Sequence, residues 1–400
     1  AVSIKPDTAE IHNNLGIALK EQGKLDEALG LFRKALSLKP DFAEAYYNMG
    51  NAFRDRGKLE ESIEAYNKAL SIKPDYALSY NNMGNALRDQ GKLEEATEAF
   101  KKAIAINADF AEAYSNMGNA LQNQGKLKEA IGAYNQAISA KPNYDMAYWK
   151  RSGAADTLSE AKNWVERCLK VNPNHLEAKL IMTAFEFYEG NKGEFNDILN
   201  SSLKDHPFTR SFIWVFSLNK LPPLFFHRWA LFDEMIKLSK TQRPFYEFGV
   251  WRGEAFKYFI KTFKKGYGFD TFKGLPENWH DIKTGTYSSE GNVPKIKGGE
   301  FIVGKFEDTL PRFFSENRPT ASLINFDADL YSSTICALNF AKQVIDRHTI
   351  LIFDEFIINK NWEEDEYKAL EEFCAINQYT YEVLAISFFT KQVAVRIIGI

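Results

Sequence analysis

The chain has 400 residues, enough for two or three domains of ordinary size. Lysine and arginine number 50 and aspartate and glutamate 53, for a net charge of −3, and neither half is basic. This balance argues against nucleic-acid binding and against an anionic membrane surface. No apolar run is long enough to span a bilayer. Three cysteines without a CxxC motif give no disulfide framework, which predicts a reducing, cytoplasmic location.

The N-terminal half repeats with a fixed period of 34 residues. Two glycines and one aromatic position recur at this interval: Gly16, Gly50, Gly84, Gly118; Gly23, Gly57, Gly91, Gly125; Phe32, Tyr66, Phe100, Tyr134. Apolar residues at helical spacing predict two helices in each period, with the second glycine in the turn between them. One such hairpin cannot bury its apolar face alone, so neighbouring hairpins are expected to stack into a superhelix.

This pattern resembles the tetratricopeptide repeat (TPR). Four clear units cover 9–144 and two degenerate units cover 145–208, so a TPR α-solenoid is expected over 1–210. Asparagines recur on the first helices, which line the concave face in that family: Asn14, Asn48, Asn82, Asn116 and Asn51, Asn85, Asn119. Two interpretations are open. The amides bind the backbone of a protein or peptide partner in a groove, or they belong to the structural consensus of the repeat.

The pattern changes after the array. Residues 211–242 are rich in aromatic side chains and are broken by Pro222-Pro223, which predicts a helical junction. Beyond it, runs of strand length alternate with helical stretches, and two closing strands are separated by a short turn. The expected strands are 245–250, 267–272, 301–303, 321–326, 349–353, 380–389 and 392–398, and the expected helices are 254–264, 308–316, 333–346 and 364–377. This alternation predicts a parallel, doubly wound sheet with a terminal antiparallel hairpin over 243–400.

Ligands bind such sheets at the carboxyl ends of the strands, and polar residues stand at those ends here. The first strand leads into Gly249 and Gly253, which allow a tight turn but do not form the GxGxxG pattern of a dinucleotide site. An NAD(P) oxidoreductase is therefore disfavoured. The second strand ends at Asp270, whose carboxylate suits the hydroxyls of a ribose.

Four segments taken in order, GFDTFKGLPE (268–277), GKFEDTLP (304–311), DADLYSST (327–334) and FDEF (353–356), resemble the TylF/macrocin O-methyltransferase family. The resemblance covers about 243–398. It implies a Rossmann-like class I methyltransferase domain that uses S-adenosylmethionine (SAM) and a divalent cation, typically Mg²⁺, to methylate a hydroxyl of a sugar or glycan-like acceptor. It also implies roles for cofactor-binding residues, with Glu247, Gly249 and Gly253 at the methionine portion, Asp270 at the ribose, and Glu307 or Asp308 at the adenine.

The remaining carboxylates suit such a reaction. A sugar hydroxyl is a very weak acid, and a bound divalent cation lowers its pKa and orients it. Mg²⁺ prefers oxygen ligands, and the tips of adjacent strands lie about 4.8 Å apart. We expect Asp327, Asp354 and Glu355 to bind the metal and Asp329 to act as base, with the roles of Asp327 and Asp329 interchangeable.

Structural alternatives exist for three of these assignments. Asp329 and Asp308 each stand near the start of a predicted helix, where an aspartate often caps the N-terminus. His280, within the long polar segment 275–299, either assists catalysis at the acceptor site or lies on a surface loop. For the whole chain, the alternative to an enzyme is a peptide-binding TPR scaffold whose α/β domain no longer catalyses. No oligomeric state follows from these patterns.

Overall fold

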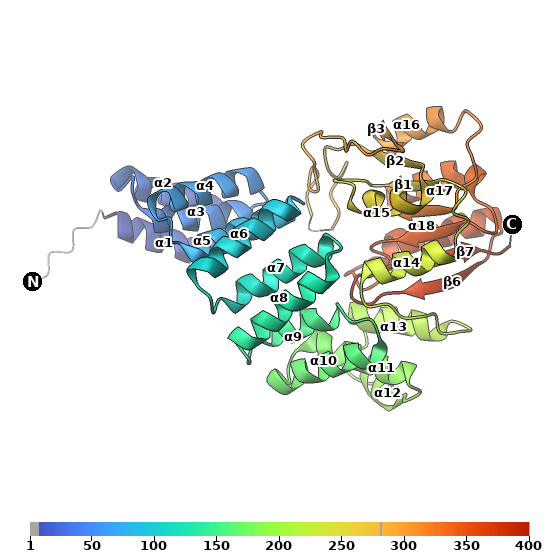
Figure 1. Cartoon of the computed structure of the whole chain (residues 1–400), viewed down its shortest axis with the longest axis horizontal. Coiled ribbons are helices and arrows are strands. Elements are labelled where there is room, and N and C mark those ends of the chain that lie inside the picture. The colour runs from blue at the N-terminus through green and yellow to red at the C-terminus, as the bar shows by residue number, and fades with distance from the viewer. Residues whose placement is uncertain (1–7, 281, 400) are drawn as a thin grey trace, which may run out of the picture. The chain divides into compact units, whose positions relative to one another are not determined.

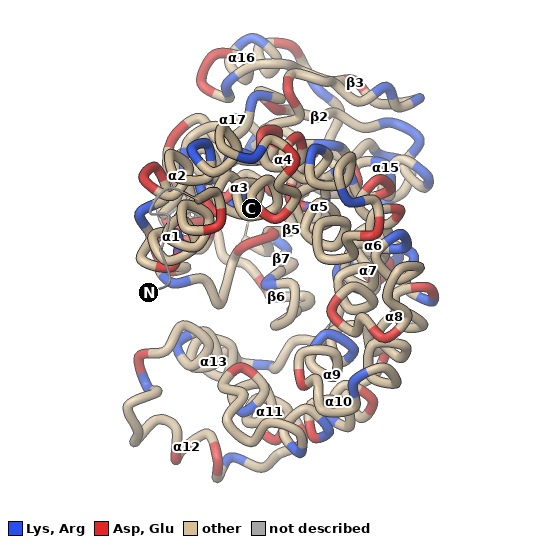
Figure 2. Tube along the Cα trace, turned by 90° about the vertical axis from the view of Figure 1, so that its left-hand side faces the viewer, with Lys and Arg blue, Asp and Glu red and all other residues tan. Residues whose placement is uncertain are grey.

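The computed structural model describes residues 8–280 and 282–399. The chain divides into two compact units, Ala1–Lys150 and Arg151–Ile400 (Figure 1). Lysine, arginine, aspartate and glutamate are interspersed along both units, with no long tract of one sign (Figure 2). Within the described part of the chain, no helix has both the length and the apolar character that a membrane crossing requires.

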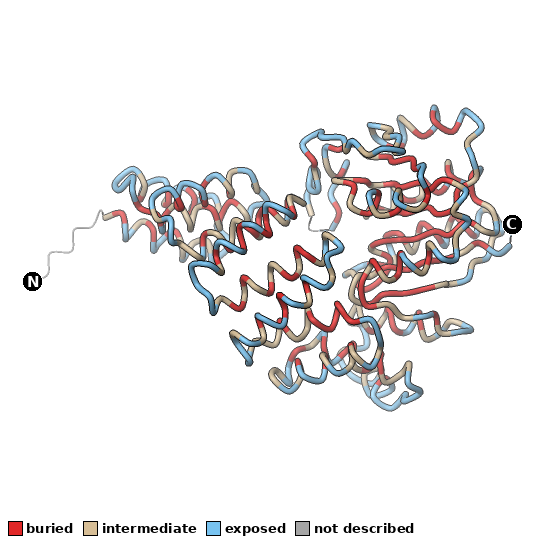
Figure 3. The backbone as a smooth tube through the Cα atoms, viewed as in Figure 1, coloured by how far each residue is buried: buried red, intermediate tan, exposed pale blue. Residues whose placement is uncertain are grey.

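The first unit is a stack of helical hairpins, as the 34-residue period predicts. Its helices are α1 (Ala9–Glu21), α2 (Leu25–Leu38), α3 (Ala43–Asp55), α4 (Leu59–Ile72), α5 (Ala77–Asp89), α6 (Leu93–Ile106), α7 (Ala111–Asn123) and α8 (Leu127–Ala140). Helix α9 (Asp145–Ser152) spans the division between the two units. Each helix packs against the next along the chain. The inner sides of the helices are buried and their outer turns are exposed (Figure 3).

The repeated glycines have two different physical roles. Gly57 has a φ of +77° in the turn between α3 and α4, a conformation that costs glycine little. Gly84 instead lies inside α5, where a Cβ would come within 2.6 Å of Phe100 Cε1 on α6. The same pairing joins Gly50 to Tyr66 and Gly118 to Tyr134. The repeated aromatic side chain therefore fills the space that the missing Cβ leaves, which sets the close approach of the two helices.

The degenerate repeats form the predicted helices but belong to the second unit. These helices are α10 (Leu158–Val171), α11 (Leu176–Tyr188) and α12 (Gly193–Leu199), followed by α13 (Pro207–Ser217). The structure thus divides the chain 60 residues before the predicted boundary at 210. Helix α13 contacts the C-terminal part of the same unit. Arg210 Nε lies 2.6 Å from Glu363 Oε1, Ser211 Oγ accepts a hydrogen bond from Ile358 N (2.8 Å), and the Trp214 ring packs 5.6 Å from Phe356.

The sheet has the predicted alternation and a terminal hairpin. Its elements are β1 (Phe245–Phe248), α15 (Glu254–Phe263), β2 (Gly266–Asp270), β3 (Gly299–Val303), α16 (Phe306–Phe313), β4 (Leu323–Phe326), α17 (Tyr331–Ala341), β5 (Ile350–Phe353), α18 (Glu366–Asn377), β6 (Tyr381–Ile386) and β7 (Val393–Ile397), with short 3₁₀ turns at Lys342–Val344 and Trp362–Glu364. The strand order is β3-β2-β1-β4-β5-β7-β6. Strands β1 to β5 pair in parallel, and β7 pairs antiparallel with both β5 and β6.

Helices cover both faces of this sheet. Helix α14 (Arg228–Leu238) and α15 bury Phe232 and Phe259 against Phe245 and Ile350 on one face. On the other face, Phe313 of α16 packs against Phe269, and α17 and α18 follow beside α16. The segment 211–242, expected to be a junction, is therefore not a mere connector, because α14 is one of the layers that bury the sheet.

Histidines cap three helices of the second unit, a feature that the sequence analysis did not assign. The Nδ1 atoms of His175, His206 and His227 accept backbone N–H bonds at the starts of α11, α13 and α14, at 3.1–3.3 Å. Burial lowers the pKa of His227, although Asp156 at 3.5 Å opposes this, and burial also lowers the pKa of His206. Only the neutral ring can accept at Nδ1, and a positive charge is unfavourable at a helix N-terminus.

The first prediction concerns the glycine of the helix pair. Gly84→Ala should destabilise the array by about 1–3 kcal/mol, because the added methyl group has no room beside Phe100. Gly30→Ala, inside α2 with nothing within 4 Å of the added Cβ, should instead be neutral or stabilising by up to about 1 kcal/mol. Urea unfolding followed by circular dichroism measures both changes. Equal effects of the two substitutions would contradict this explanation of the repeat.

The second prediction concerns pH. The folded pKa of His227 lies below its unfolded value, so the unfolded chain binds more protons, and stability is lost as pH falls from about 6.5 through the folded pKa. His227→Asn keeps a capping side chain that does not titrate. We expect urea unfolding at pH 7.5 and 5.5 to show a smaller loss of stability in this variant than in the wild-type protein. An unchanged loss would mean that other groups cause the pH dependence.

Candidate active site

Four phenylalanines align the carboxyl ends of the parallel strands. Phe269, Phe248, Phe326 and Phe353 are register partners on β2, β1, β4 and β5. Their rings stack with centroid separations of 4.8, 5.4 and 4.8 Å. The residue after each phenylalanine is a predicted site residue: Asp270, Gly249, Asp327 and Asp354. Because successive side chains of a strand point to opposite faces, these four residues share the face opposite the stacked rings.

Carboxylates gather at this edge with few partners. Asp327 and Asp329 are half-buried, and among the described residues no hydrogen bond to their carboxylates is recorded. Burial raises the pKa of Asp327 well above its ordinary value, and repulsion from Asp354 adds to the effect. Burial likewise raises the pKa of Asp329, with repulsion from Asp327 next in importance. The structure therefore brings together the two residues for which the sequence predicts the base and metal-ligand roles.

The other two predicted metal ligands have cationic neighbours. Arg228 Nη2 lies 3.0 Å from Asp354 Oδ2, and the amide of Gln392 donates to Asp354 Oδ1. Lys391 Nζ lies 2.9 Å from Glu355 Oε2, which also accepts from Asn359 Nδ2 at 2.7 Å. Burial raises the pKa of Glu355, although Lys391 opposes this. Arg228 comes from α14 and Lys391 from the turn between β6 and β7, and no sequence motif indicated either residue.

Asp329 adopts an unusual backbone conformation. Its φ is +59°, and Leu330 N donates to Ala328 O at 2.6 Å across it, which makes a tight three-residue turn. Such a conformation is strained for a residue other than glycine, and strain of this kind concentrates at functional sites. Helix α17 begins at Tyr331 with Leu330 as its N-cap and no side-chain cap. The capping interpretation of Asp329 is therefore wrong, and so is that of Asp308, because α16 begins earlier with Lys305 as its N-cap.

The glycine turn after β1 is held by Asp270. Asp270 Oδ2 accepts from Val250 N (2.8 Å) and Trp251 N (2.7 Å), while Oδ1 accepts from Phe272 N (2.6 Å). Gly249 has a φ of +87°, and a Cβ there would collide with the carbonyl of Asp327. Gly253, with a φ of +76°, ends the turn at the start of α15. Asp270, the carboxylate that the sequence analysis places at a ribose, therefore has a structural role, because it holds the glycine turn that a cofactor would approach.

Three more buried polar side chains line the same region. Glu247 is 1% exposed and its Oε2 has no hydrogen-bond partner among the described residues, as is true of Oδ1 of its strand partner Asn325. Burial raises the pKa of Glu247 well above its ordinary value. The third is Glu366, the first residue of α18, whose Oε2 accepts from Glu355 N at 3.2 Å. Sequence reasoning missed Asn325 and Glu366, because neither stands in a recognisable motif.

The predicted adenine-side and acceptor-side residues lie further out. Glu307 and Asp308 are exposed in the first turn of α16, and Glu307 Oε1 lies 3.5 Å from Lys305 Nζ. The structure does not bring them into the carboxylate cluster. His280 lies in the connection between β2 and β3, where its Nε2 is 2.8 Å from Asp365 Oδ2.

The donor set can be compared with the needs of a divalent cation. All the carboxylates of the cluster offer oxygen ligands, and their mutual repulsion indicates an excess of negative charge. Across residues 8–280 and 282–399, however, no group of three or more histidine, cysteine, aspartate or glutamate side chains is arranged to hold a metal ion. The cluster thus offers the oxygen atoms that Mg²⁺ prefers, but two of the predicted ligands, Asp354 and Glu355, are in ion pairs with Arg228 and Lys391.

The repeated asparagines of the first unit bond largely to one another. Asn82 Nδ2 donates to Asn51 Oδ1 (2.9 Å) and Tyr47 OH (3.0 Å), and Asn116 Nδ2 donates to Asn81 Oδ1 (3.1 Å). Equivalent bonds join Asn48 to Asn13 and Asn119 to Tyr134. Asn14 is exposed, and Asn85 Oδ1 is buried without a partner among the described residues. These contacts support a structural ladder between repeats and leave the groove interpretation as a prediction.

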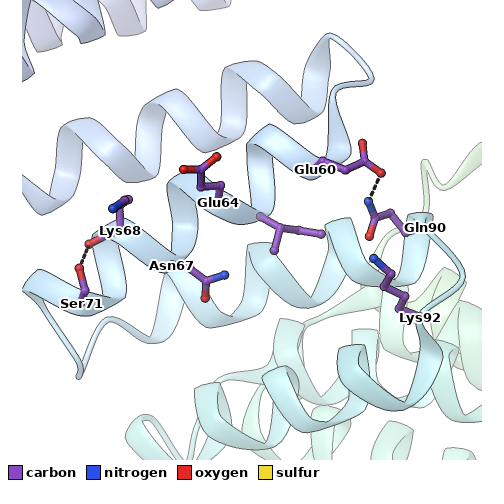
Figure 4. A pocket seen from close by; sticks show the side chains of 8 residues that line it. Glu60, Glu64, Asn67, Lys68, Ser71, Gln90 and Lys92 are labelled. Atoms are coloured by element: carbon purple, nitrogen blue, oxygen red, sulfur yellow. Dashed lines mark hydrogen bonds between the residues drawn. The ribbon is translucent and has the colours of Figure 1, made fainter. Parts of the chain in front are cut away.

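A separate cleft of about 550 Å³ lies on the array (Figure 4). It is formed by α4 and by the turn between α5 and α6, and none of the repeated asparagines lines it. Glu60, Glu64, Lys68 and Lys92 give it a balanced charge, and Gln90 Nε2 donates to Glu60 Oε1 at 2.5 Å. Nothing in this cleft indicates a particular ligand.

Comparison with known proteins identifies the repeats. Residues 18–53, 50–87 and 84–125 match a model described as TPR repeat, and residues 111–144 match the tetratricopeptide repeat model. The N-terminal region is therefore a TPR array, and TPR arrays are protein-interaction scaffolds. No curated protein matches the chain.

Several solved structures are similar to part of the chain. A crystal structure of MamA is 26% identical with a TM-score of 0.37, covering 40% of this chain and 96% of that one. YrrB, described as a TPR protein with an unusual peptide-binding site, is 22% identical with a TM-score of 0.36, covering 44% and 91%. PilF of Pseudomonas aeruginosa is 17% identical with a TM-score of 0.44, covering 52% and 96%.

The third prediction tests the structural role of Asp270, which is to hold the glycine turn. Asp270→Ala leaves three backbone N–H groups without their charged acceptor, so we expect a loss of at least about 2 kcal/mol of stability. Glu300→Ala, an exposed acidic position on the edge strand β3, should change stability by less than about 0.5 kcal/mol. Urea unfolding measures both. Wild-type stability in Asp270→Ala would show that the carboxylate does not hold the glycine turn.

Proposed function

We propose that the second unit is a SAM-dependent O-methyltransferase that acts on a hydroxyl of a sugar or glycan-like acceptor, while the TPR array binds a protein or peptide partner. The observation that carries this proposal is the reversal of the strand order between β1 and β4, with predicted site residues at the tips of both strands. Open α/β sheets bind their ligands at such a switch point, outside the carboxyl ends of the strands. The antiparallel β7, inserted between β5 and β6, also supports a Rossmann-like methyltransferase architecture.

The cofactor would lie against the glycine turn. Gly249 and Gly253 bring the backbone close to a ligand, and the unpartnered Oε2 of Glu247 would accept from the ammonium of the methionine portion. Asp270 Oδ1 accepts one backbone bond and keeps a further lone pair for a ribose hydroxyl. Glu307 or Asp308, at the tip beyond β3, would serve the adenine side.

Asp329 is the proposed base. In the reaction, the acceptor oxygen forms a bond to the methyl carbon, the carbon–sulfur bond breaks with its electron pair passing to sulfur, and the hydroxyl proton passes to Asp329. A carboxylate whose pKa is raised by burial and by Asp327 is a stronger base than an ordinary one. Among the described residues, none forms a hydrogen bond to its carboxylate at the β4 tip, so the carboxylate is available to an acceptor.

A divalent cation would assist the same step. Asp327, Asp354 and Glu355 would hold it, and when bound it would lower the pKa of the acceptor hydroxyl. The excess of carboxylates over Arg228 and Lys391 supports this assignment. For the ion to bind all three residues, those two side chains would have to release Asp354 and Glu355.

The same ion pairs favour the second candidate function. If Arg228 and Lys391 stay in place, Asp354 and Glu355 serve the fold, and the chain is a peptide-binding TPR scaffold with an inactive α/β domain. The two candidates differ in one measurable property, because only an enzyme has a need for the cofactor.

The fourth prediction tests cofactor binding. Calorimetric titration with S-adenosylhomocysteine, with and without Mg²⁺, should give a dissociation constant in the micromolar range, and Glu300→Ala should bind equally well. Asp329→Asn retains the size of the side chain and tolerates a positive φ. It should keep binding the cofactor product while turnover on a sugar acceptor falls at least about 100-fold. Absence of binding by the wild-type protein under both conditions would favour the scaffold.

A further inference from the structure

The connection between β2 and β3 contains a hairpin in place of the usual crossover helix. Leu275 N donates to Thr286 O (2.8 Å) and Gly285 N donates to Leu275 O (2.9 Å). Nearer the tip, Trp279 and Ile282 exchange backbone bonds of 2.9 and 2.7 Å. We call the described residues of this hairpin, 275–280 and 282–286, the flap. The sequence predicts only a long polar segment here, because the flap is too short and too polar to show strand periodicity.

Three contacts hold the flap against the rest of the second unit. His280 Nε2 lies 2.8 Å from Oδ2 of Asp365, whose side chain is buried. The Trp279 ring is 7% exposed and packs with Leu275 and Leu330. Ser332 Oγ donates to Glu277 Oε1 at 2.5 Å. A polar hairpin that buries a tryptophan and spends two polar side chains on such contacts is a docked element, not a free surface loop.

The docking points adjoin the carboxylates of the site. Leu330 directly follows Asp329, and Asp365 directly precedes Glu366. Beyond the flap, the same connection reaches the glycine turn, where Trp251 Nε1 donates to Ser288 O at 3.3 Å and the Tyr287 ring lies 5.8 Å from the Trp251 ring. The connection therefore reaches from the cofactor turn to the acid cluster, over the edge at which both stand.

We propose that the flap is a gate on the acceptor side of the carboxylate site and that His280 is a positioning residue, which latches the gate onto Asp365. The assignment of an acceptor rests on the proposed function. The latch itself rests on the three contacts. The docked flap restricts the approach to the half-buried Asp329, and opening of the latch widens that approach for an acceptor. His280 Nε2 is engaged by Asp365 Oδ2 in this arrangement, and we assign proton transfer from the acceptor to Asp329.

The test uses carboxylate labelling of the full chain. A water-soluble carbodiimide with glycine ethyl ester labels accessible carboxylates, and mass spectrometry gives the rate at each residue. His280→Ala should raise the labelling rate of Asp329 about tenfold, the scale of one hydrogen bond to a charged group. The rate at the exposed Glu307 should not change. Hydrogen exchange of amides 275–286 should accelerate in parallel, while exchange in β1 and β4 stays as in the wild-type protein.

Further variants guard against trivial explanations. Asp365→Asn weakens the latch from its other side, and Ser332→Ala removes the Glu277 contact without changing any charge, so both should also raise the rate at Asp329. His348→Ala, a histidine away from the flap in the same unit, is the matched control and should have no effect. Thermal melting identifies any variant that fails to fold.

The outcomes separate the gate from the enzyme. Wild-type labelling and exchange rates in folded His280→Ala and Ser332→Ala would overturn the gate. Faster labelling in these variants supports it, whether or not S-adenosylhomocysteine binds. Calorimetry on the same samples then decides the proposed function independently, since the latch variants leave the glycine turn untouched and should bind the cofactor product within about twofold of the wild-type affinity.

Discussion

The stack of Phe269, Phe248, Phe326 and Phe353 is the constraint on which the second unit depends. It fixes the register of four parallel strands at their last positions, and a slip of one residue would turn every following side chain to the opposite face. Because Phe269, Phe326 and Phe353 each directly precede an aspartate, the same packing that buries the sheet also brings these carboxylates together. The packing of the aromatic stack thus offsets the repulsion among those carboxylates. The same strand register sets the positions of the buried rings and of the site residues that follow them.

Sequence reasoning succeeded wherever the signal was local or periodic. The 34-residue period predicted the helices of the array, and the strand runs predicted β1 to β7 to within a few residues. It failed where a residue acts through distant chain segments. Arg228, Lys391 and Glu366 surround the predicted acids from α14, the β6–β7 turn and α18, yet none follows a strand tip or belongs to a motif. The contacts of α13 are non-local in the same way, since Arg210 and Trp214 pack on residues about 150 positions away.

Ion pairs neutralise part of the negative charge of the carboxylate cluster. A buried carboxylate that lacks a counter-charge is costly, and nearby carboxylates raise that cost. Arg228 and Lys391 form ion pairs with Asp354 and Glu355, whereas their weaker attraction to Asp327 and Asp329 does not offset burial and repulsion, and the pKa values of both aspartates stay well raised. A protein selected for stability alone would gain by replacing one of these two aspartates. Their retention beside a strained turn at Asp329 is easier to explain by chemistry than by folding, which is why we favour the enzyme over the inactive scaffold.

The contacts of the flap also give a physical reason for the motifs that suggested the function. The segments GFDTFKGLPE and DADLYSST lie more than 50 residues apart, yet Leu275 of the first packs with Leu330 of the second, and Glu277 of the first accepts from Ser332 of the second. Each motif contains both a strand-tip carboxylate and a residue that makes a flap contact. A change at the contact residue of one motif would therefore weaken its packing against the other motif. The motif pair thus joins the acid cluster at the strand tips to the flap. Under the proposed function, the strand tips would supply the chemistry and the flap would control access to it.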